Sequence, residues 1–367
     1  MAHMSEIINK KYFFTKHLLQ WHAGHHRPLP WKGEKNPYLV WLSEIILQQT
    51  RVEQGLPYFE KFREKYPTVH DLALAPEDEV MKMWEGLGYY SRARNLHSAA
   101  RFIANELGGK FPDTFEDIRS LKGVGDYTAA AVASFALGLP HAVVDGNVYR
   151  VLSRYFGIEE PVDTAKGKKF FAQLAQELLD ETRPGNYNQA IMDFGATHCT
   201  PAAPKCPACP LRSHCEAFHQ KKIDSFPVKS KKLQRRQRFF NYLIINQNDS
   251  VFIKKRTGKD IWQNLYEFPL IETNALPENR QQVIESELWQ QWLGKNAHRL
   301  LRISAPVKQE LTHQQIVALF WEIEVDEKFR PGEEEWMLTE KRQLKNFAFP
   351  KIIDLYFKQK LLPLELL

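Results

Sequence analysis

Two acidic residues, Glu44 and Asp145, lie in sequence surroundings that favour different protonation states. Glu44 falls inside the apolar stripe of a predicted helix, Tyr38–Gln49, and burial among apolar side chains raises a carboxyl pKa. A carboxyl group that stays protonated near neutral pH can act as a general acid. Asp145 directly precedes a predicted helix, Asn147–Tyr155, whose N-terminal N–H groups favour the ionised carboxylate. The alternatives are a solvent-facing glutamate and an aspartate that only caps a helix.

The four cysteines form one cluster with the spacing C-x6-C-x2-C-x5-C. They are Cys199, Cys206, Cys209 and Cys215. Because the N-terminus carries no apolar secretory signal, clustered cysteines favour a metal site over disulfides or free buried thiols. Four thiolates suit either tetrahedral zinc or a [4Fe–4S] cluster, and the spacing alone leaves both open.

A glycine pair, Gly123 and Gly125, separates two predicted helical stretches. The first stretch ends at Leu121, and the second, Tyr127–Leu137, is rich in alanine and a strong helix former. Glycine permits a tight hairpin and lets the backbone approach a ligand closely. The exposed N–H groups of the hairpin and of the following helix could hold a phosphate. An ordinary helix–turn–helix corner is the alternative.

A second glycine-containing turn, Gly86–Arg94, reads G-L-G-Y-Y-S-R-A-R. Arg92 and Arg94 could contact phosphates, and Tyr89 could wedge between bases or stack on them. This combination is typical of a loop that faces DNA. The alternative is that both tyrosines pack in a core.

The elements around these residues change character along the chain. Residues 1–222 show helical periodicity throughout and predict an all-α catalytic domain, and residues 223–238 form a basic linker that could follow a phosphate backbone. A solvated tether with no partner is the alternative for the linker. Residues 239–367 predict a separate α+β domain. Its strands are expected at Phe239–Ile245, Val251–Lys255 and Ile316–Val325, and its helices at Arg280–Leu293 and Phe349–Lys360.

Length and composition limit the number of domains, the class of protein and the kind of partner that we expect. The 367 residues suggest two domains, and 43% hydrophobic with 26% charged residues is ordinary for a soluble protein with real cores. A net charge of +6 makes an anionic partner plausible. No stretch has the apolar length of a membrane span, so we expect a cytoplasmic location and no membrane partner. Residues Met1–Met4, M-A-H-M, resemble an expression scar.

Taken together, these motifs resemble the helix-hairpin-helix DNA glycosylases that carry an iron–sulfur cluster. The hairpin, an aspartate twenty residues after its second glycine, and the cysteine loop after the last helix carry this resemblance. Three longer motifs are similar to adenine DNA glycosylases of the MutY type over nearly the full length. They are W-L-S-E-I-I-L-Q-Q-T-R-V, G-L-G-Y-Y-S-R-A-R-N-L and V-D-G-N-V-Y-R-V-L-S-R. The resemblance implies one [4Fe–4S] cluster rather than zinc.

The resemblance implies an enzyme of base excision repair that hydrolyses the bond between adenine and its sugar. Its partner would be double-stranded DNA with adenine opposite 8-oxoguanine or guanine. Glu44 would protonate the adenine, and Asp145 would stabilise the cationic sugar electrostatically or as a transient nucleophile, as paired carboxyl groups do in glycoside cleavage. Tyr127 stands where bifunctional endonuclease III relatives carry a lysine, and a tyrosine cannot form a Schiff base. Strand cleavage by that route should therefore be absent.

The adenine must leave the helix before it can react, which costs a few kcal/mol of stacking and pairing. By resemblance, Arg27, Trp31 and Gln189 line the base pocket, while Gln49 and Tyr89 fill or wedge the vacated stack. The further DNA-contacting residues implied by the resemblance are Gln48, Thr50, Arg92, Arg94, Gly123, Gly125 and Asn147.

The C-terminal domain resembles the Nudix fold, and W-Q-N-L-Y-E-F-P at Trp262–Pro269 fits the version found in this family. The acidic run that binds magnesium in Nudix hydrolases is missing, and residues 280–288 do not replace it. The resemblance therefore implies a domain that recognises 8-oxoguanine, through Thr312 and His313. This loop often has the sequence F-S-H in the family, whereas here Leu311 and Thr312 precede the histidine.

Two other functions are alternatives to this interpretation. A bifunctional endonuclease III–like lyase is disfavoured by Tyr127 and by the long C-terminal domain. A catalytically silent DNA-binding protein is disfavoured because Glu44 and Asp145 are both present. We expect a monomer of bacterial type that associates with the nucleoid.

Overall fold

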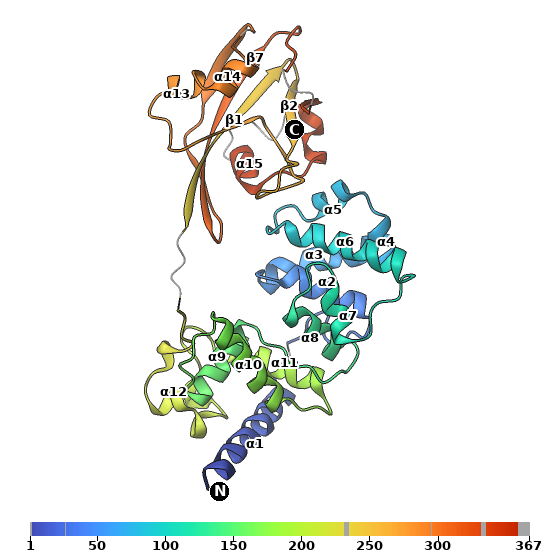
Figure 1. The fold of residues 1–367 in the computed structure, drawn as a ribbon, viewed down its shortest axis with the longest axis vertical. Coiled ribbons are helices and arrows are strands. Elements are labelled where there is room, and N and C mark those ends of the chain that lie inside the picture. Colours follow the sequence, from blue (N-terminus) through green and yellow to red (C-terminus); the bar gives the residue numbers. More distant parts are fainter. Residues whose placement is uncertain (1, 26, 231–234, 295, 332–334, 359–367) are drawn as a thin grey trace. The chain divides into compact units, whose positions relative to one another are not determined.

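The computed structural model describes residues 2–25, 27–230, 235–294, 296–331 and 335–358 (Figure 1). Three of the predicted segments extend beyond these ranges. Residues 231–234 of the predicted linker lie outside the described residues. The same holds for the last two residues of the predicted helix Phe349–Lys360 and for the first residue of the expression scar.

The chain divides into two compact units. The first unit comprises residues 1–73 and 98–232, and the second comprises residues 74–97 and 233–367. The helical segment 74–97 is thus grouped with residues 233–367, for example through the hydrogen bonds of Arg94 to Gln263 and of Tyr266 to Asp78.

Residues 2–230 form helices and, within the described part of the chain, no strand, which confirms the predicted all-α region. The α-helices are α1 (Ala2–Ala23), α2 (Pro37–Leu47), α3 (Val52–Lys65), α4 (Val69–Leu74), α5 (Glu77–Met83), α6 (Ser91–Glu106), α7 (Phe115–Ser120), α8 (Asp126–Phe135), α9 (Gly146–Phe156), α10 (Ala165–Leu178), α11 (Pro184–Thr197) and α12 (Glu216–His219). The short 3-10 helices are η1 (Cys206–Ala208), η2 (Arg212–His214) and η3 (Ile223–Ser225). Among the described residues, no helix has the length and apolar character required to span a membrane.

The core of the first unit lies among α1, α8, α9, α10 and α11. Its fully buried side chains include Phe14, Leu152 and Phe171, each at 0% exposure. Helices α9 and α11 approach each other closely at Gly195, where an added Cβ would lie 2.6 Å from the Cβ of Asn147. Only glycine fits there, and the close approach brings the start of α9 against α11.

The second unit contains a mixed eight-stranded sheet, which confirms the predicted α+β domain. Its strands are β1 (Arg236–Gln247), β2 (Ser250–Lys255), β3 (Tyr266–Glu267), β4 (Leu270–Thr273), β5 (His298–Ile303), β6 (Val307–Glu310), β7 (Gln314–Val325) and β8 (Met337–Glu340). The long strands β1 and β7 pair in parallel at the centre, as Figure 1 shows, and the remaining described pairs are antiparallel.

Alternating side chains of β7 pack on two sides of the sheet, as the period-two pattern predicts. Trp321 packs against Trp289 of α14 (Glu287–Trp292), with ring centroids 5.7 Å apart. Phe320, one residue earlier, stacks on Tyr356 of α15 (Lys351–Tyr356), with centroids 3.9 Å apart. The sheet is therefore covered by helices on both faces.

The predicted single helix over Arg280–Leu293 is wrong in one respect. It is divided into α13 (Gln281–Ile284) and α14, because the Ser286 hydroxyl accepts a hydrogen bond from the Trp289 N–H and starts a new helix. A 3-10 helix, η4 (Lys341–Asn346), precedes α15.

Candidate active site

Glu44 is buried because the other side chains around it on helix α2 are mostly apolar. Asn36 caps the helix by accepting a hydrogen bond from the Tyr38 N–H at 3.0 Å, and Pro37 occupies the first turn. Every residue of α2 from Val40 to Ile46 is buried, and Glu44 among them is only 6% exposed. Burial raises the pKa of Glu44 to about 7, a hydrogen bond from the Tyr127 hydroxyl lowers it, and the charge of Asp145 raises it. A pKa of about 7 leaves a substantial fraction of Glu44 protonated at neutral pH, as a general acid requires.

Asp145 is the N-cap of α9, as predicted. Its carboxylate accepts hydrogen bonds from the Val148 N–H at 2.8 Å and from the Asn147 side-chain amide at 2.7 Å. Burial raises the pKa of Asp145 above its usual value, whereas these hydrogen bonds and the charge of Arg150 lower it. The N–H donors thus favour ionisation in the sense predicted, although burial is the larger effect.

Both carboxyl groups line one cavity of about 450 Å³. Tyr127 also lines it, and its hydroxyl hydrogen-bonds to Glu44, so three elements meet at this point. The remaining lining residues are Leu47, Gln48, Gln49, Gly125, Thr128 and Gly146. Gln48 donates a hydrogen bond to the Thr128 hydroxyl at 3.1 Å, while Gln49 is exposed in a left-handed conformation with φ of 54°. Thr50, which follows, is half-buried.

Glu44 also lines a second cavity of about 490 Å³. Trp31 and Gln189, two of the predicted base-pocket residues, line it together with His22 and Lys32. Trp31 is held by an edge-to-face contact with Phe59, with centroids 5.3 Å apart. The third predicted residue, Arg27, is not among the side chains that line this cavity and lies 3.8 Å from Asp193 instead.

The helix-hairpin-helix consists of α7, a tight turn and α8. Gly123 has φ of 82°, a left-handed conformation that favours glycine, whereas Gly125 is extended and begins α8. No atom lies within 4 Å of the place where a Gly125 Cβ would stand. A phosphate can therefore approach the N-terminus of α8 along the backbone.

Arg150 connects the catalytic end of α9 to the cysteine loop. Its guanidinium donates to the Cys199 carbonyl at 2.8 Å, to the Gly195 carbonyl at 2.7 Å and to the Asn147 side-chain oxygen at 2.8 Å. Because the Asn147 amide in turn donates to Asp145, the orientation of this carboxylate depends on the loop. We did not predict this role from the sequence, because an arginine inside a helix carries no local signal for it.

The four cysteines are half-buried thiols without disulfides. Burial raises the pKa of Cys206, Cys209 and Cys215, and the charge of neighbouring cysteines raises each pKa further, so the four thiols lie near one another. The Arg154 guanidinium lies 3.5 Å from the Cys199 sulfur. Among the described residues, no three His, Cys, Asp or Glu side chains are grouped as for a single metal ion.

In the second unit, the turn 86–94 and the predicted recognition loop meet. The Tyr89 hydroxyl hydrogen-bonds to that of Thr312, and Tyr89 is 44% exposed with φ of 49°. Arg92 is buried and lies over the rings of Trp84 and Tyr89. Arg94 is half-buried and donates to the Gln263 carbonyl at 2.7 Å. Both arginines thus support the turn in this structure.

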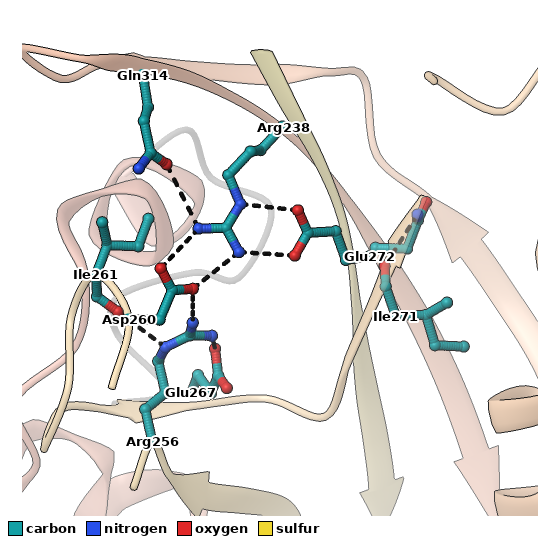
Figure 2. Close-up of polar contacts among 9 residues, drawn as sticks. Arg238, Arg256, Asp260, Ile261, Glu267, Ile271, Glu272 and Gln314 are labelled. Carbon is teal, nitrogen blue, oxygen red and sulfur yellow. Dashed lines mark hydrogen bonds and ion pairs between the residues drawn. The ribbon is translucent and has the colours of Figure 1, made fainter. Parts of the chain in front are cut away.

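The recognition loop, Leu311–His313, is the turn of the hairpin between β6 and β7, where His313 is exposed. Figure 2 shows the ion-pair cluster beside it. Arg238 pairs with both oxygens of Glu272, at 2.7 Å each, and with those of Asp260, at 2.8 and 2.9 Å. Gln314, the first residue after the loop, accepts a further hydrogen bond from Arg238 at 3.4 Å.

Comparisons with known proteins identify the family of each part of the chain. The model of the HhH-GPD superfamily base excision DNA repair proteins matches residues 42–179, and the NUDIX domain model matches residues 241–359. Adenine DNA glycosylase of Buchnera aphidicola subsp. Acyrthosiphon pisum (strain APS) is 35% identical over 300 residues, which cover 80% of this chain and 86% of the relative. The chain belongs to the adenine DNA glycosylase family.

Other relatives extend this picture. Adenine DNA glycosylase of Homo sapiens is 45% identical over 214 residues, which cover 56% of this chain and 39% of the relative. The structure of a thermostable thymine-DNA glycosylase is similar with a TM-score of 0.55 and 32% identity, covering 58% of this chain and 99% of that one. A non-covalent endonuclease III–DNA complex, at 23% identity and a TM-score of 0.50 over 57% of this chain and 95% of that one, shares the fold.

The predicted fold class is therefore confirmed: a helix-hairpin-helix glycosylase region is followed by a Nudix-like domain. The predicted enzyme class is confirmed as well, since members of the family hydrolyse N-glycosidic bonds in DNA.

Proposed function

We propose that this glycosylase excises adenine opposite 8-oxoguanine or guanine and leaves the DNA strand intact. The observation that carries the proposal is the cavity shared by Glu44 and Asp145. One carboxyl group has a pKa near neutral pH, and the other accepts hydrogen bonds at a helix N-terminus. This is the pairing of acid and ionised carboxylate that glycosidic cleavage requires.

In the proposed reaction, Glu44 donates its proton to the imidazole nitrogen N7 of an adenine turned out of the helix. The glycosidic electron pair then moves to the base, which leaves as neutral adenine. Asp145 faces the developing positive charge on the sugar and stabilises it electrostatically. Water adds to the sugar carbon C1′ and gives a proton to the Glu44 carboxylate, which yields an abasic site and restores the acid.

Tyr127 supports hydrolysis without strand cleavage. Its hydroxyl hydrogen-bonds to Glu44 and cannot form a Schiff base with the opened sugar. Borohydride trapping should therefore give no efficient covalent complex, and the abasic strand should break only after alkali or heat. A covalent complex that maps to a lysine near the cavity would contradict this.

We assign recognition of the opposite base to Thr312 and His313. The support is that Tyr89, the proposed wedge, contacts Thr312 directly within the second unit. His313 is exposed at the tip of a hairpin, where it can reach a base in DNA. A monomer located at the nucleoid is part of this proposal.

We further infer that Cys199, Cys206, Cys209 and Cys215 hold one [4Fe–4S] cluster. The donor set fits: four neighbouring thiols without disulfides, with Arg154 beside one sulfur. A cluster is larger than a single ion, so its thiolate ligands need not converge on one point. When bound, it would cross-link the loop that Arg150 connects to Asp145. Anaerobically prepared protein should contain iron and sulfide, and stoichiometric zinc without iron would refute the assignment.

Single-turnover kinetics test the function. Duplexes with adenine opposite 8-oxoguanine, guanine, thymine or cytosine would be incubated with excess protein, and strands would be cleaved with alkali. We expect excision opposite 8-oxoguanine and guanine, and slower excision opposite the other two. Lack of adenine excision from every duplex would refute the proposal.

A further inference from the structure

Asp193 in α11 is a buried carboxylate outside the reaction described above. The residue is 1% exposed, yet it has polar neighbours on several sides. Its oxygens lie 2.6 Å from the Lys32 ammonium and 3.3 Å from the His22 ring nitrogen. Gln189, one turn earlier on α11, donates to it at 3.4 Å, and the Arg27 guanidinium lies 3.8 Å away. A carboxylate this deeply buried needs such partners to remain ionised.

Three of these four partners line the cavity of about 490 Å³ that also exposes Glu44 and Trp31. They are His22, Lys32 and Gln189. Asp193 itself does not line the cavity, so it contacts these side chains from behind. A buried group that fixes several lining side chains determines which donors the cavity presents to a base.

Asp193 and Lys32 shift each other's pKa in this cluster. Burial alone would raise the pKa of Asp193, but the hydrogen bonds and charges of His22 and Lys32 bring it below its usual value. Burial lowers the pKa of Lys32, against the opposing effect of Asp193. Asp193 thus compensates a half-buried ammonium group in a cavity shared with the catalytic acid.

We propose that Asp193 is a positioning residue for recognition of the base: it orients Lys32 and Gln189 toward the base edge and holds the Lys32 charge away from Glu44. This rests on the proposed excision of adenine. Without Asp193, the Lys32 ammonium would be free to stabilise the ionised form of Glu44, and the enzyme would lose its acid at lower pH.

The protonation of Glu44 is controlled by a defined set of groups. Tyr127 and Asp145 face it from α8 and α9. Across the cavity, the titratable or charged side chains are His22, Lys32, Lys35 and Arg183. Of these, His22 and Lys32 contact Asp193.

The test is the single-turnover excision rate between pH 5.5 and 9 for the wild type and for Asp193→Asn, which keeps the shape and removes the charge. We expect excision at neutral pH to fall about 10- to 100-fold, since a small misplacement of a bound group has effects of this size. We also expect the alkaline limb of the profile to move to lower pH by about one unit. The rate ratio of adenine to purine, which lacks the exocyclic amine, should decrease.

Two further variants keep the test decisive. Lys32→Met removes one of the two cationic side chains beside Asp193 and so makes the surroundings of Glu44 more negative. The alkaline limb should therefore move to higher pH, opposite to Asp193→Asn. Glu177→Gln is the matched control, because Glu177 forms an ion pair with a lysine of α1 at the exposed surface of the same unit. This control should leave the excision rate, the alkaline limb of the pH profile and the adenine-to-purine rate ratio unchanged.

A lowered Tm for Asp193→Asn with an unchanged limb and an unchanged adenine-to-purine ratio would show a purely structural role and overturn the inference. If Asp193→Asn fails to fold, a limb that does not move in Lys32→Met overturns it equally. Failure of the wild type to excise adenine at all would instead refute the proposed function.

Discussion

At the scale of single residues, two neighbours, Tyr127 and Asp145, shift the pKa of Glu44 in opposite directions. Its pKa is raised to about 7 by three effects together. Burial is the largest and raises the pKa, the Tyr127 hydrogen bond lowers it, and the Asp145 charge raises it. General acid catalysis is most efficient when the pKa of the acid lies near the working pH. The value of about 7 therefore results from opposing contributions that single substitutions can separate.

Tyr127→Phe removes the hydrogen bond that lowers the pKa of Glu44 and leaves the ring in place. The pKa should rise, so the alkaline limb of the excision profile should move to higher pH. Single-turnover rates between pH 5.5 and 9 measure this shift. A limb that moves to lower pH would contradict the assigned hydrogen bond.

Glu44→Gln should make the protein more stable above neutral pH. The folded pKa of about 7 lies above the ordinary value of 4.5, so the folded state binds the proton more tightly than the unfolded chain. Stability from this group is present below pH 4.5 and is lost as the pH rises to about 7. The glutamine variant lacks this loss. At pH 8 its free energy of unfolding should therefore exceed that of the wild type, by at most about 3 kcal/mol. Its Tm at pH 8 should be correspondingly higher. The two proteins should differ less at pH 5, and equal Tm values at pH 8 would argue against burial of the charge.

At the scale of elements, α9 is the helix on which the site depends. It presents Asp145 at its first turn, and it is joined to the cysteine loop through Arg150. Its cap was predictable from the sequence, because Asp145 precedes a clear helical pattern. The connection to Cys199 was not, because it joins residues 49 positions apart.

Arg150→Lys keeps the charge and loses the planar fork that contacts Asn147, Gly195 and Cys199 together. Asp145 should lose its fixed orientation, and excision should decrease about 10- to 100-fold. Retained affinity for the mispaired duplex would show that the fold survives. Wild-type excision by this variant would mean that the connection is not needed for catalysis.

In the second unit, the cluster around Arg238 in Figure 2 holds the end of the recognition hairpin. Arg238→Met removes the arginine that pairs with both oxygens of Glu272, while Asp260 keeps its ion pair with Arg256. We expect a lower Tm and a smaller preference for 8-oxoguanine over guanine, with adenine excision opposite guanine less affected. Arg299→Met is the control, because its pair with Glu324 is solvent-exposed and should contribute little. Equal effects of both substitutions would contradict the anchoring role.

At the scale of the whole molecule, sequence patterns predicted the elements better than their long-range contacts. The all-α region, the change to an α+β domain and the burial of Glu44 followed from periodicity and from local caps. The strands β3, β4, β6 and β8 were missed, because two to four residues carry too little pattern. Strand β5 was missed because none of its six residues is buried, so it has no period-two apolar pattern. Asp193 was missed because its partners His22 and Lys32 lie 171 and 161 positions away. Such contacts are determined by tertiary packing, and only the folded chain shows them.

The most direct test of the account compares wild type and Glu44→Gln on one duplex with adenine opposite 8-oxoguanine, with single-turnover excision and equilibrium binding measured in parallel. We predict that excision falls by about 10²–10⁴-fold, the usual contribution of general acid catalysis. Binding should remain within a few-fold, because the substitution removes only a proton donor. Excision by Glu44→Gln at the wild-type rate, with binding unchanged, would contradict the assignment of Glu44 as the acid that releases the base.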